Sequence, residues 1–393
     1  MLKETNRFEV LTDLLNQENC FKMICGAGNE DKEYVKKLAL VYTLAGAKIL
    51  DVSANVEVVK FASEGIDLAF EKAEELNINL KDRPFIMVSI GMPGDHHVRK
   101  SYIDPQACIA CGLCAPVCPT YAIPNDFHFK ENLEVFINLG GSLEKEDQTK
   151  EIVIKDLCIG CGKCSNICPK DDIIFYRHNS QELKELLPKC MEAGAECFEL
   201  HAGVDDDEIV VKEWELLNEI NPTNYNSLCL DRLNLGNLNI EHRIEKAKSI
   251  SGKKIIIQAD GYPMSGGQDD MNTTLQAVAC ADVVNKKFNM RLNRKKDSDL
   301  KSKAKISSTR HYYPHGHRHG IYIILSGGTN SLSKKLANTA GVRVNGVAVG
   351  TYARDIIEFH IQDPDFYSDD SIIEGAYKIA NKLVVSNTGN KYE

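Results

Sequence analysis

The chain has 393 residues and a formal net charge of −9, with 43% hydrophobic and 26% charged residues. This length allows one large domain or two medium ones, and the composition is typical of a soluble globular protein. An acidic chain is repelled by nucleic acid and by anionic membranes, and no apolar run approaches the roughly 20 residues that span a bilayer, so we expect neither kind of partner. Residues 1–17 lack the apolar core of an export signal, which predicts a cytoplasmic protein.

Three apolar runs alternate with two amphipathic stretches before residue 92. The runs cover residues 21–28, 47–54 and 84–91, and the stretches between them cover residues 30–46 and 55–76. Apolar runs that alternate with helical periodicity indicate parallel strands covered by helices. This part of the chain therefore predicts the order strand, helix, strand, helix, strand.

Cysteine usage separates into two kinds. Of the 14 cysteines, eight lie in two tight runs, and the other six are scattered among apolar neighbours. A disulfide scaffold is typical of short secreted chains, whereas isolated cysteines usually behave as small hydrophobic residues. We therefore predict that the scattered cysteines are buried and unpaired: Cys20, Cys25, Cys190, Cys197, Cys229 and Cys280.

The two runs share the pattern C-x₂-C-x₂-C-x₃-C-P, at Cys108–Pro119 and at Cys158–Pro169. Zinc needs four ligands and usually takes them from separated pairs, so a third cysteine in the same run is surplus. Disulfides between cysteines three positions apart are strained and open in a reducing compartment. Three closely spaced thiolates suit three irons of one [4Fe–4S] cluster. We therefore favour two [4Fe–4S] clusters, with zinc as the main alternative.

Duplication of the run follows from this geometry, because the fourth cysteine of each run ligates the cluster held by the other run. Cluster 1 is predicted to take Cys108, Cys111, Cys114 and Cys168, and cluster 2 to take Cys158, Cys161, Cys164 and Cys118. Gly112 and Gly162 are expected to let backbone amides approach the sulfurs. The paired runs resemble the bacterial two-cluster ferredoxin module, which implies one-electron transfer. The long spacer at residues 120–157 departs from that module and predicts an added hairpin or helix.

Five further apolar runs, again alternating with helical stretches, follow the cysteines. They cover residues 195–203, 224–232, 253–261, 320–329 and 344–353. Three strands before the cysteines and five after them make eight, the number that closes a (β/α)₈ barrel. We therefore predict an α/β protein, a TIM-like barrel formed by residues 1–91 and 181–393, with a ferredoxin-like α+β domain inserted at residues 92–180. The alternative is two small α/β domains that flank the ferredoxin, and pairing of run 21–28 with run 344–353 would favour the barrel.

Candidate site residues lie at the C-terminal ends of the predicted strands, where barrels carry their chemistry. Glycines end the last two strands, at the place where barrels hold phosphate through backbone amides. The candidate phosphate site is Gly327, Gly328, Gly350 and Thr351, and Asp260 with Gly261 completes the candidate cofactor set. A tight turn is the alternative explanation of the paired glycines. Strand-end acids such as Asp51 and Glu199 suit acid–base work, helix capping or ion pairing equally, so no catalytic residue is assigned.

A basic and histidine-rich segment occupies about residues 285–320. Residues 285–310 contain ten basic and two acidic residues, and four histidines follow within nine positions. Electrostatic steering of an acidic redox partner is one interpretation, and a solvated surface loop is the simpler one. Glycine and proline among the histidines give no fixed metal geometry.

Segments outside the cysteine runs are similar to the light-dependent period protein (LdpA) family of cyanobacteria. The similarity is carried by "IIIQADGYPMSGG", "LSGGTNSLSKKL" and "GVAVGTYAR", together with the region of residues 21–55. It implies iron–sulfur ligands at the eight cysteines of the runs, and a protein that senses cellular redox state and passes it to the circadian clock. The implied partner is a redox protein or a clock or other regulatory protein.

Two functions remain open at this point. The favoured one is an electron-transfer or redox-sensing protein without substrate chemistry of its own. The alternative comes from a resemblance of the overall plan to dihydroorotate and dihydropyrimidine dehydrogenases, which are flavin-dependent barrels fed by ferredoxin clusters. In that case the last two strand ends would hold the phosphate of FMN, and Lys22 or Asp51 would touch the flavin ring.

Overall fold

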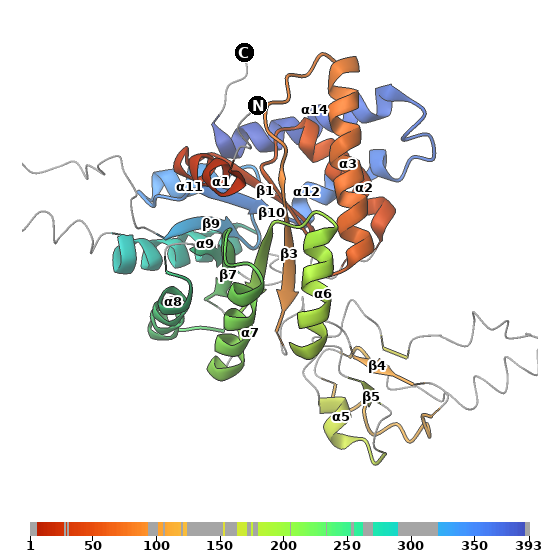
Figure 1. The fold of residues 1–393 in the computed structure, drawn as a ribbon, viewed down its shortest axis with the longest axis vertical. Helices are drawn as coiled ribbons and strands as arrows, with labels where there is room; N and C mark the ends of the chain where they lie inside the picture. The colour runs from red at the N-terminus through yellow and green to blue at the C-terminus, as the bar shows by residue number, and fades with distance from the viewer. Residues whose placement is uncertain are drawn as a thin grey trace, which may run out of the picture.

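The computed structural model gives the arrangement of most of the chain. It describes residues 6–26, 29, 31–92, 101–104, 107–118, 121–123, 152–153, 163–170, 174–175, 180–204, 206–232, 234–252, 255–261, 270–289 and 321–389. Helices surround a central set of strands, and a smaller unit lies beside the lower end of α6 (Figure 1). None of the helices in these ranges is long and apolar enough to cross a bilayer.

Eight parallel strands form a closed barrel in the order β1-β10-β9-β8-β7-β6-β3-β2. Their bounds are β1 Cys20–Gly26, β2 Ile49–Ser53, β3 Phe85–Gly91, β6 Cys197–His201, β7 Asn226–Asp231, β8 Ile255–Asp260, β9 Tyr322–Ser326 and β10 Gly346–Val349. The first and last strands pair in parallel, with Phe21 opposite Val347. This closing pair confirms the predicted barrel and excludes two separate α/β domains.

Helices cover the outside of the barrel and follow the strands in chain order, apart from α1, which precedes β1. Their bounds are α1 Arg7–Asn16, α2 Lys32–Leu44, α3 Val56–Glu75, α6 Ser180–Glu192, α7 Asp207–Ile220, α8 Asn237–Ser251, α9 Asp270–Val284, the π-helix η3 Asn285–Asn289, α11 Ser333–Thr339, α12 Thr351–Asp355, α13 Glu358–Ile361 and α14 Asp370–Thr388. Several of these helices have a residue with a short polar side chain at the N-cap position. Asp31, Asn55 and Asp206 each accept backbone N–H groups of the first turn, which satisfies donors that the helix itself leaves open.

Side chains along each strand alternate between the barrel interior and the helices, as strand geometry requires. On β1, Phe21 and Met23 join the large core between strands and helices, whereas Cys20 belongs to a second core inside the barrel. That second core fills the half of the barrel nearest the N-terminal ends of the strands. Leu11 and Leu15 of α1 cover this end of the core. On most strands, the interior residue two positions after a member of this second core is polar. The C-terminal half of this barrel therefore differs from the apolar filling that is usual in such barrels.

The chain between β3 and β6 carries the cysteine runs. Its described parts include β4 (Tyr102–Ile103), the short helix α5 (Lys163–Ile167) and β5 (Ile174–Phe175), and β4 pairs with β5 in antiparallel. β3 and β6 pair directly with each other along five residues, from Met87 opposite Cys197 to Gly91 opposite His201. The intervening chain therefore leaves the barrel at the C-terminal end of β3 and returns at the start of α6, which places both connections at the C-terminal face. The boundaries near residues 92 and 180 stay a prediction, and the predicted hairpin or helix of the spacer falls almost entirely outside the described residues.

Candidate functional site

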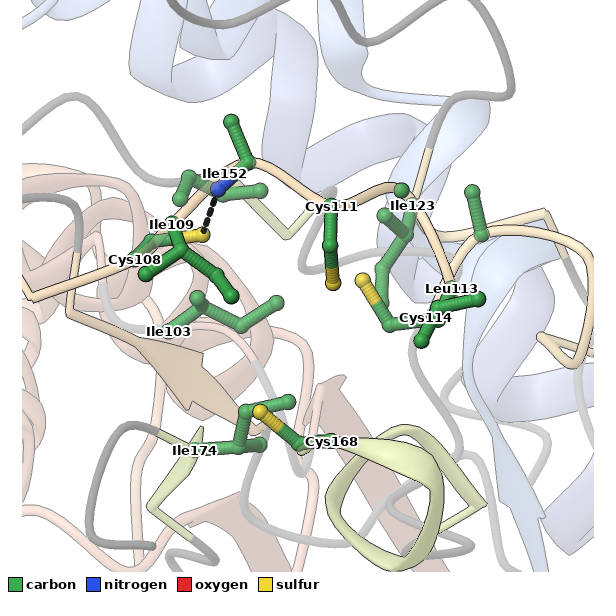
Figure 2. Close-up of a pocket in the computed structure, with 13 residues that line it drawn as sticks. Ile103, Cys108, Ile109, Cys111, Leu113, Cys114, Ile123, Ile152, Cys168 and Ile174 are labelled. Atoms are coloured by element: carbon green, nitrogen blue, oxygen red, sulfur yellow. Dashed lines mark hydrogen bonds between the residues drawn. The ribbon is translucent and has the colours of Figure 1, made fainter. Parts of the chain in front are cut away.

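Four cysteines from the two runs line one pocket. Cys108, Cys111 and Cys114 come from the first run, and Cys168 comes from the second. Figure 2 shows the sulfurs of Cys111 and Cys114 directed into the same space, with Cys168 facing it from the other side. The remaining lining is almost wholly apolar and includes Ile103, Ile109, Leu113, Ile123, Ile152 and Ile174. These are the four cysteines that the sequence assigns to cluster 1, and the fourth member of the first run, Cys118, is not among the lining residues.

The backbone of the first cysteine run directs an N–H group to a sulfur and contains two residues with left-handed φ angles. The backbone N–H of Ala110 donates to Cys108 Sγ over 3.4 Å, the bond drawn in Figure 2. Ala110 and Gly112 both have left-handed backbone angles, with φ of +52° and +74°. A Cβ on Gly112 would meet nothing within 4 Å, so the glycine is explained by its backbone angle and not by crowding. Amide donors to sulfur are among the features that tune iron–sulfur centres.

Electrostatics at the pocket favour a bound cation. Burial raises the pKa of the Cys114 thiol to about 11, and the neighbouring sulfurs of Cys108, Cys164 and Cys111 raise it further. Several thiolates this close together repel one another, and metal ions relieve that repulsion by binding the deprotonated sulfurs. Four sulfur donors in an apolar pocket therefore fit the [4Fe–4S] group that the spacing predicts.

The cysteines assigned to cluster 2 are only partly within the described residues. Cys164 belongs to the small apolar core of this unit, and Cys118 packs against that core. Cys158, Cys161 and Gly162 lie outside the described residues, so the ligand set of cluster 2 stays a prediction. The six scattered cysteines are buried, as predicted, and none of them forms a disulfide within the described residues.

A polar layer crosses the barrel interior above the apolar core. At its centre Lys22 Nζ lies 2.7 Å from Asp51 Oδ2, 2.6 Å from Glu199 Oε2 and 2.7 Å from Gln258 Oε1. Ser227 Oγ donates to Glu199 Oε2 over 2.7 Å, and Ser89 Oγ donates to Asp51. All six side chains are buried, and each comes from a different strand: Lys22, Asp51, Ser89, Glu199, Ser227 and Gln258.

The central lysine of this layer is held in its charged form. Burial alone lowers the pKa of Lys22, but the carboxylates of Asp51 and Glu199 outweigh it and raise the pKa above its ordinary value. Burial raises the pKa of Asp51, and the charge of Lys22 opposes that rise. A lysine that stays protonated donates hydrogen bonds and supplies positive charge, but it is a poor nucleophile.

The candidate cofactor residues at the strand ends fall into two groups. Asp260, Gly261 and Gly327 lie together, because a Cβ on Gly327 would approach Asp260 Oδ1 to 1.8 Å and Gly261 N donates to Ser326 O over 3.1 Å. Gly328 packs as closely against α9, where an added Cβ would lie 2.4 Å from Thr273. Both glycines lie just after β9 and have left-handed φ angles, so close packing and the turn account for the pair.

Gly350 and Thr351 follow the neighbouring strand β10. Arg354, which the sequence analysis did not single out, donates to Thr351 Oγ1 over 3.1 Å and to the carbonyl of Cys25 over 3.3 Å. A phosphate at these two strand ends stays a prediction. Of the basic and histidine-rich segment, only Asn285–Asn289 is described, and residues 290–320 lie outside the described part of the chain.

Together the fold and the cysteine pocket define a class, a (β/α)₈ barrel that carries a ferredoxin-type iron–sulfur module. Residues 107–171 match the family model of the 4Fe-4S double cluster binding domain. The chain is 37% identical to Light dependent period A of Synechococcus elongatus over 113 residues, which cover 28% of this chain and 30% of that protein. It is also 42% identical to a ferredoxin of Streptomyces griseus over 50 residues, 11% of this chain and 48% of that one. The chain is thus an iron–sulfur protein, similar to each of these relatives over less than half of the relative's length.

The chain also shows weak similarity to several solved structures. QR15, an aldolase, matches with a TM-score of 0.40 and 9% identity over 86% of this chain and 91% of its own. A Toxoplasma gondii protein described as a deoxyribose-phosphate aldolase matches with a TM-score of 0.44 and 9% identity, over 96% and 98%. The (S)-3-O-geranylgeranylglyceryl phosphate synthase of Thermoplasma acidophilum matches with a TM-score of 0.39 and 10% identity, over 97% and 99%. The barrel assignment itself rests on the strand pairing of this chain.

Proposed function

We propose that the chain binds two [4Fe–4S] clusters and acts in electron transfer or redox sensing. The observation that carries this proposal is the pocket in which Cys168 of the second run faces three cysteines of the first. An exchange of the fourth ligand between runs is characteristic of two-cluster ferredoxins, and a module with a single run has no partner for such an exchange. The match of residues 107–171 to a double cluster binding domain supports the same conclusion.

The protein's own contribution is to hold and tune the ligands. A bound [4Fe–4S] cluster supplies reversible one-electron chemistry, at potentials between about −700 and +450 mV that depend on its surroundings. The apolar lining limits water near the sulfurs, the amide of Ala110 donates to Cys108, and Cys111 lies exposed at the edge of the pocket. An exposed ligand gives a partner protein a short route to the metal centre.

The test is anaerobic purification followed by iron and sulfide analysis of variants. Cys168→Ala should lose about half of the iron and sulfide, although it changes only the last cysteine of the second run. Cys190→Ala, which removes a buried thiol of α6 outside the runs, should keep the full content. Retention of all iron in Cys168→Ala, or four-sulfur zinc in place of iron, would overturn the proposal.

Assays of the reduced protein distinguish a role in electron transfer from a role in redox sensing. If it transfers electrons, the dithionite-reduced and desalted protein should reduce cytochrome c with two electrons per chain, one for each proposed cluster. If it senses redox state, reduction should instead change how the barrel binds a regulatory protein. The similarity to Light dependent period A is the reason to include clock proteins among the candidates. Buried thiols that form no disulfide in the described part of the chain are consistent with a reducing, cytoplasmic setting.

A flavin-dependent oxidoreductase is the second candidate function. It is favoured by the polar layer inside the barrel, which faces the same C-terminal end from which the iron–sulfur module is inserted. In this proposal Gly327, Gly328, Gly350 and Thr351 hold the phosphate of FMN. Flavin released by heat and quantified by fluorescence tests it, since an iron-loaded preparation without flavin would exclude this candidate.

A further inference from the structure

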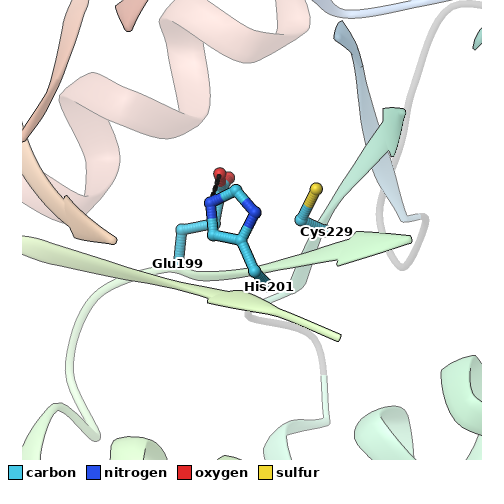
Figure 3. A group of neighbouring side chains, drawn as sticks. All are labelled: Glu199, His201 and Cys229. Carbon is cyan, nitrogen blue, oxygen red and sulfur yellow. Dashed lines mark ion pairs between the residues drawn. The ribbon is translucent and has the colours of Figure 1, made fainter. Parts of the chain in front are cut away.

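Three potential metal ligands meet inside the barrel at the ends of β6 and β7. Glu199 and His201 are two positions apart on β6, so both side chains point to the same face of the strand. The register of the sheet places Cys229 of β7 directly opposite His201. Figure 3 shows the carboxylate, the imidazole and the thiol gathered on one side of the two strands.

The donor atoms are close enough for one ion. One oxygen, one nitrogen and one sulfur, from Glu199, His201 and Cys229, all lie within 4.8 Å of one another, and all three residues are buried. Glu199 Oε1 and His201 Nε2 are 3.5 Å apart. Ligand bonds of about 2.0–2.3 Å to a tetrahedral zinc ion place ligand atoms about 3.3–3.8 Å apart. The oxygen and nitrogen already have this spacing, and the sulfur lies within 4.8 Å of both.

Neighbouring groups orient two of the three ligands. Lys22 and Ser227 both bind Glu199 Oε2, whereas Oε1, which faces His201, has no hydrogen-bond partner in the described part of the chain. The amide Nε2 of Gln258 donates to Cys229 Sγ over 3.5 Å, and the Cys229 thiol donates to Asp260 Oδ2 over 3.6 Å, so two contacts fix the position of the sulfur. Such outer contacts that fix carboxylate and sulfur ligands are a general feature of metal sites.

The charge of the layer also favours a cation. Lys22 is paired with two carboxylates, those of Asp51 and Glu199, and all three side chains are fully buried. One positive charge against two negative ones leaves a surplus of negative charge in a medium of low dielectric constant. A purely structural ion-pair network would not require a thiol and an imidazole beside the second carboxylate.

We propose that Glu199, His201 and Cys229 bind a single Zn²⁺ ion at the C-terminal end of the barrel, separate from the iron–sulfur module. Mixed oxygen, nitrogen and sulfur donors suit zinc, whereas calcium and magnesium require oxygen ligands. Three protein ligands leave the fourth tetrahedral position for water or a substrate oxygen, the arrangement of catalytic zinc sites.

The test measures zinc in the full chain purified without oxygen and dialysed against a weak chelator. Wild-type protein should retain about one zinc per chain, and X-ray absorption at the zinc edge should show one sulfur with two or three nitrogen or oxygen ligands. His201→Gln and Cys229→Ser should lose this zinc and keep iron and sulfide unchanged. The matched controls are His242→Gln, which changes an exposed side chain of α8, and Cys197→Ser, which changes a buried thiol at the opposite end of β6. Both variants should keep the zinc.

Several outcomes would overturn the proposal. Zinc bound by four sulfurs would belong to the cysteine runs, and zinc that survives His201→Gln would lie elsewhere. Wild-type protein that binds no zinc after incubation with excess zinc would exclude the site. A single iron ion with this ligand shell would refute the assignment to zinc. Added zinc should also raise the melting temperature of wild-type protein and leave that of His201→Gln unchanged, which separates loss of binding from loss of folding.

Discussion

Replacing Lys22 by methionine should destabilise the barrel far more than the same change at the surface. Lys22 Nζ lies 2.6–2.7 Å from three buried oxygen atoms, and the substitution removes the ammonium group that pairs with both Asp51 and Glu199. Removal of one partner from a buried ion pair costs about 3–5 kcal/mol, because the remaining charge stays buried and uncompensated. Lys22→Met/Asp51→Asn removes one of the two stranded charges, so its free energy of unfolding should exceed that of Lys22→Met by about 1–3 kcal/mol.

Lys72→Met is the matched control for this prediction. Lys72 also has two carboxylate partners at 2.7 Å, Glu75 and Asp370, but both partners are about half exposed. Exposed pairs contribute about 0–1 kcal/mol each. The assay is anaerobic urea unfolding followed by fluorescence of Trp214, the single tryptophan, which is buried on α7 and therefore reports on the barrel. Equal losses in Lys22→Met and Lys72→Met would refute the reasoning that burial sets the cost.

Two further predictions concern a strand-end turn and a buried phenol. Gly327→Ala puts a Cβ 1.8 Å from Asp260 at a φ of +70°, so we expect a loss of about 2–4 kcal/mol in urea unfolding. Gly341→Ala has a similar φ of +68° but open space, and should lose only about 1–2 kcal/mol; equal losses would contradict the packing argument. Burial, and then the hydrogen bond to Glu358, raises the pKa of Tyr34 above its ordinary value of 10, so its contribution to stability is complete below pH 10 and falls as pH rises further. Tyr34→Phe should therefore flatten the decline of melting temperature above pH 10, and an unchanged slope would contradict this.

Strand positions were predictable because parallel strands buried on both faces leave continuous apolar runs. All eight runs became barrel strands, and their number was enough to predict closure. The N-terminal helix α1 was not predicted. α1 is marked only by a few apolar residues, of which Leu11 and Leu15 have their partners on strands far away in the sequence. Such a helix is stabilised by tertiary packing, which local periodicity does not reveal.

The two candidate sites also differ in how far the sequence alone predicts them. The ligands of an iron–sulfur module lie close together in one short run, so they can be identified from the sequence without knowledge of the fold. The meeting of Glu199, His201 and Cys229 depends instead on the register between two strands, which the sequence does not specify. Cys229 is as buried as predicted, yet burial alone did not indicate that it lies beside an imidazole and a carboxylate. Polar residues two positions after apolar ones on successive strands were the available signal for this layer.

The direct pairing of β3 with β6 affects how the barrel would respond to oxidation of the cysteine-bearing segment. The ring of backbone hydrogen bonds closes between Met87 and Cys197 without passing through any residue of the cysteine-bearing segment. If oxygen removed the proposed clusters, the cysteines left behind would therefore lie outside that ring of strands. We expect the barrel to stay folded in that case, so that iron and sulfide could restore the clusters without refolding of the barrel.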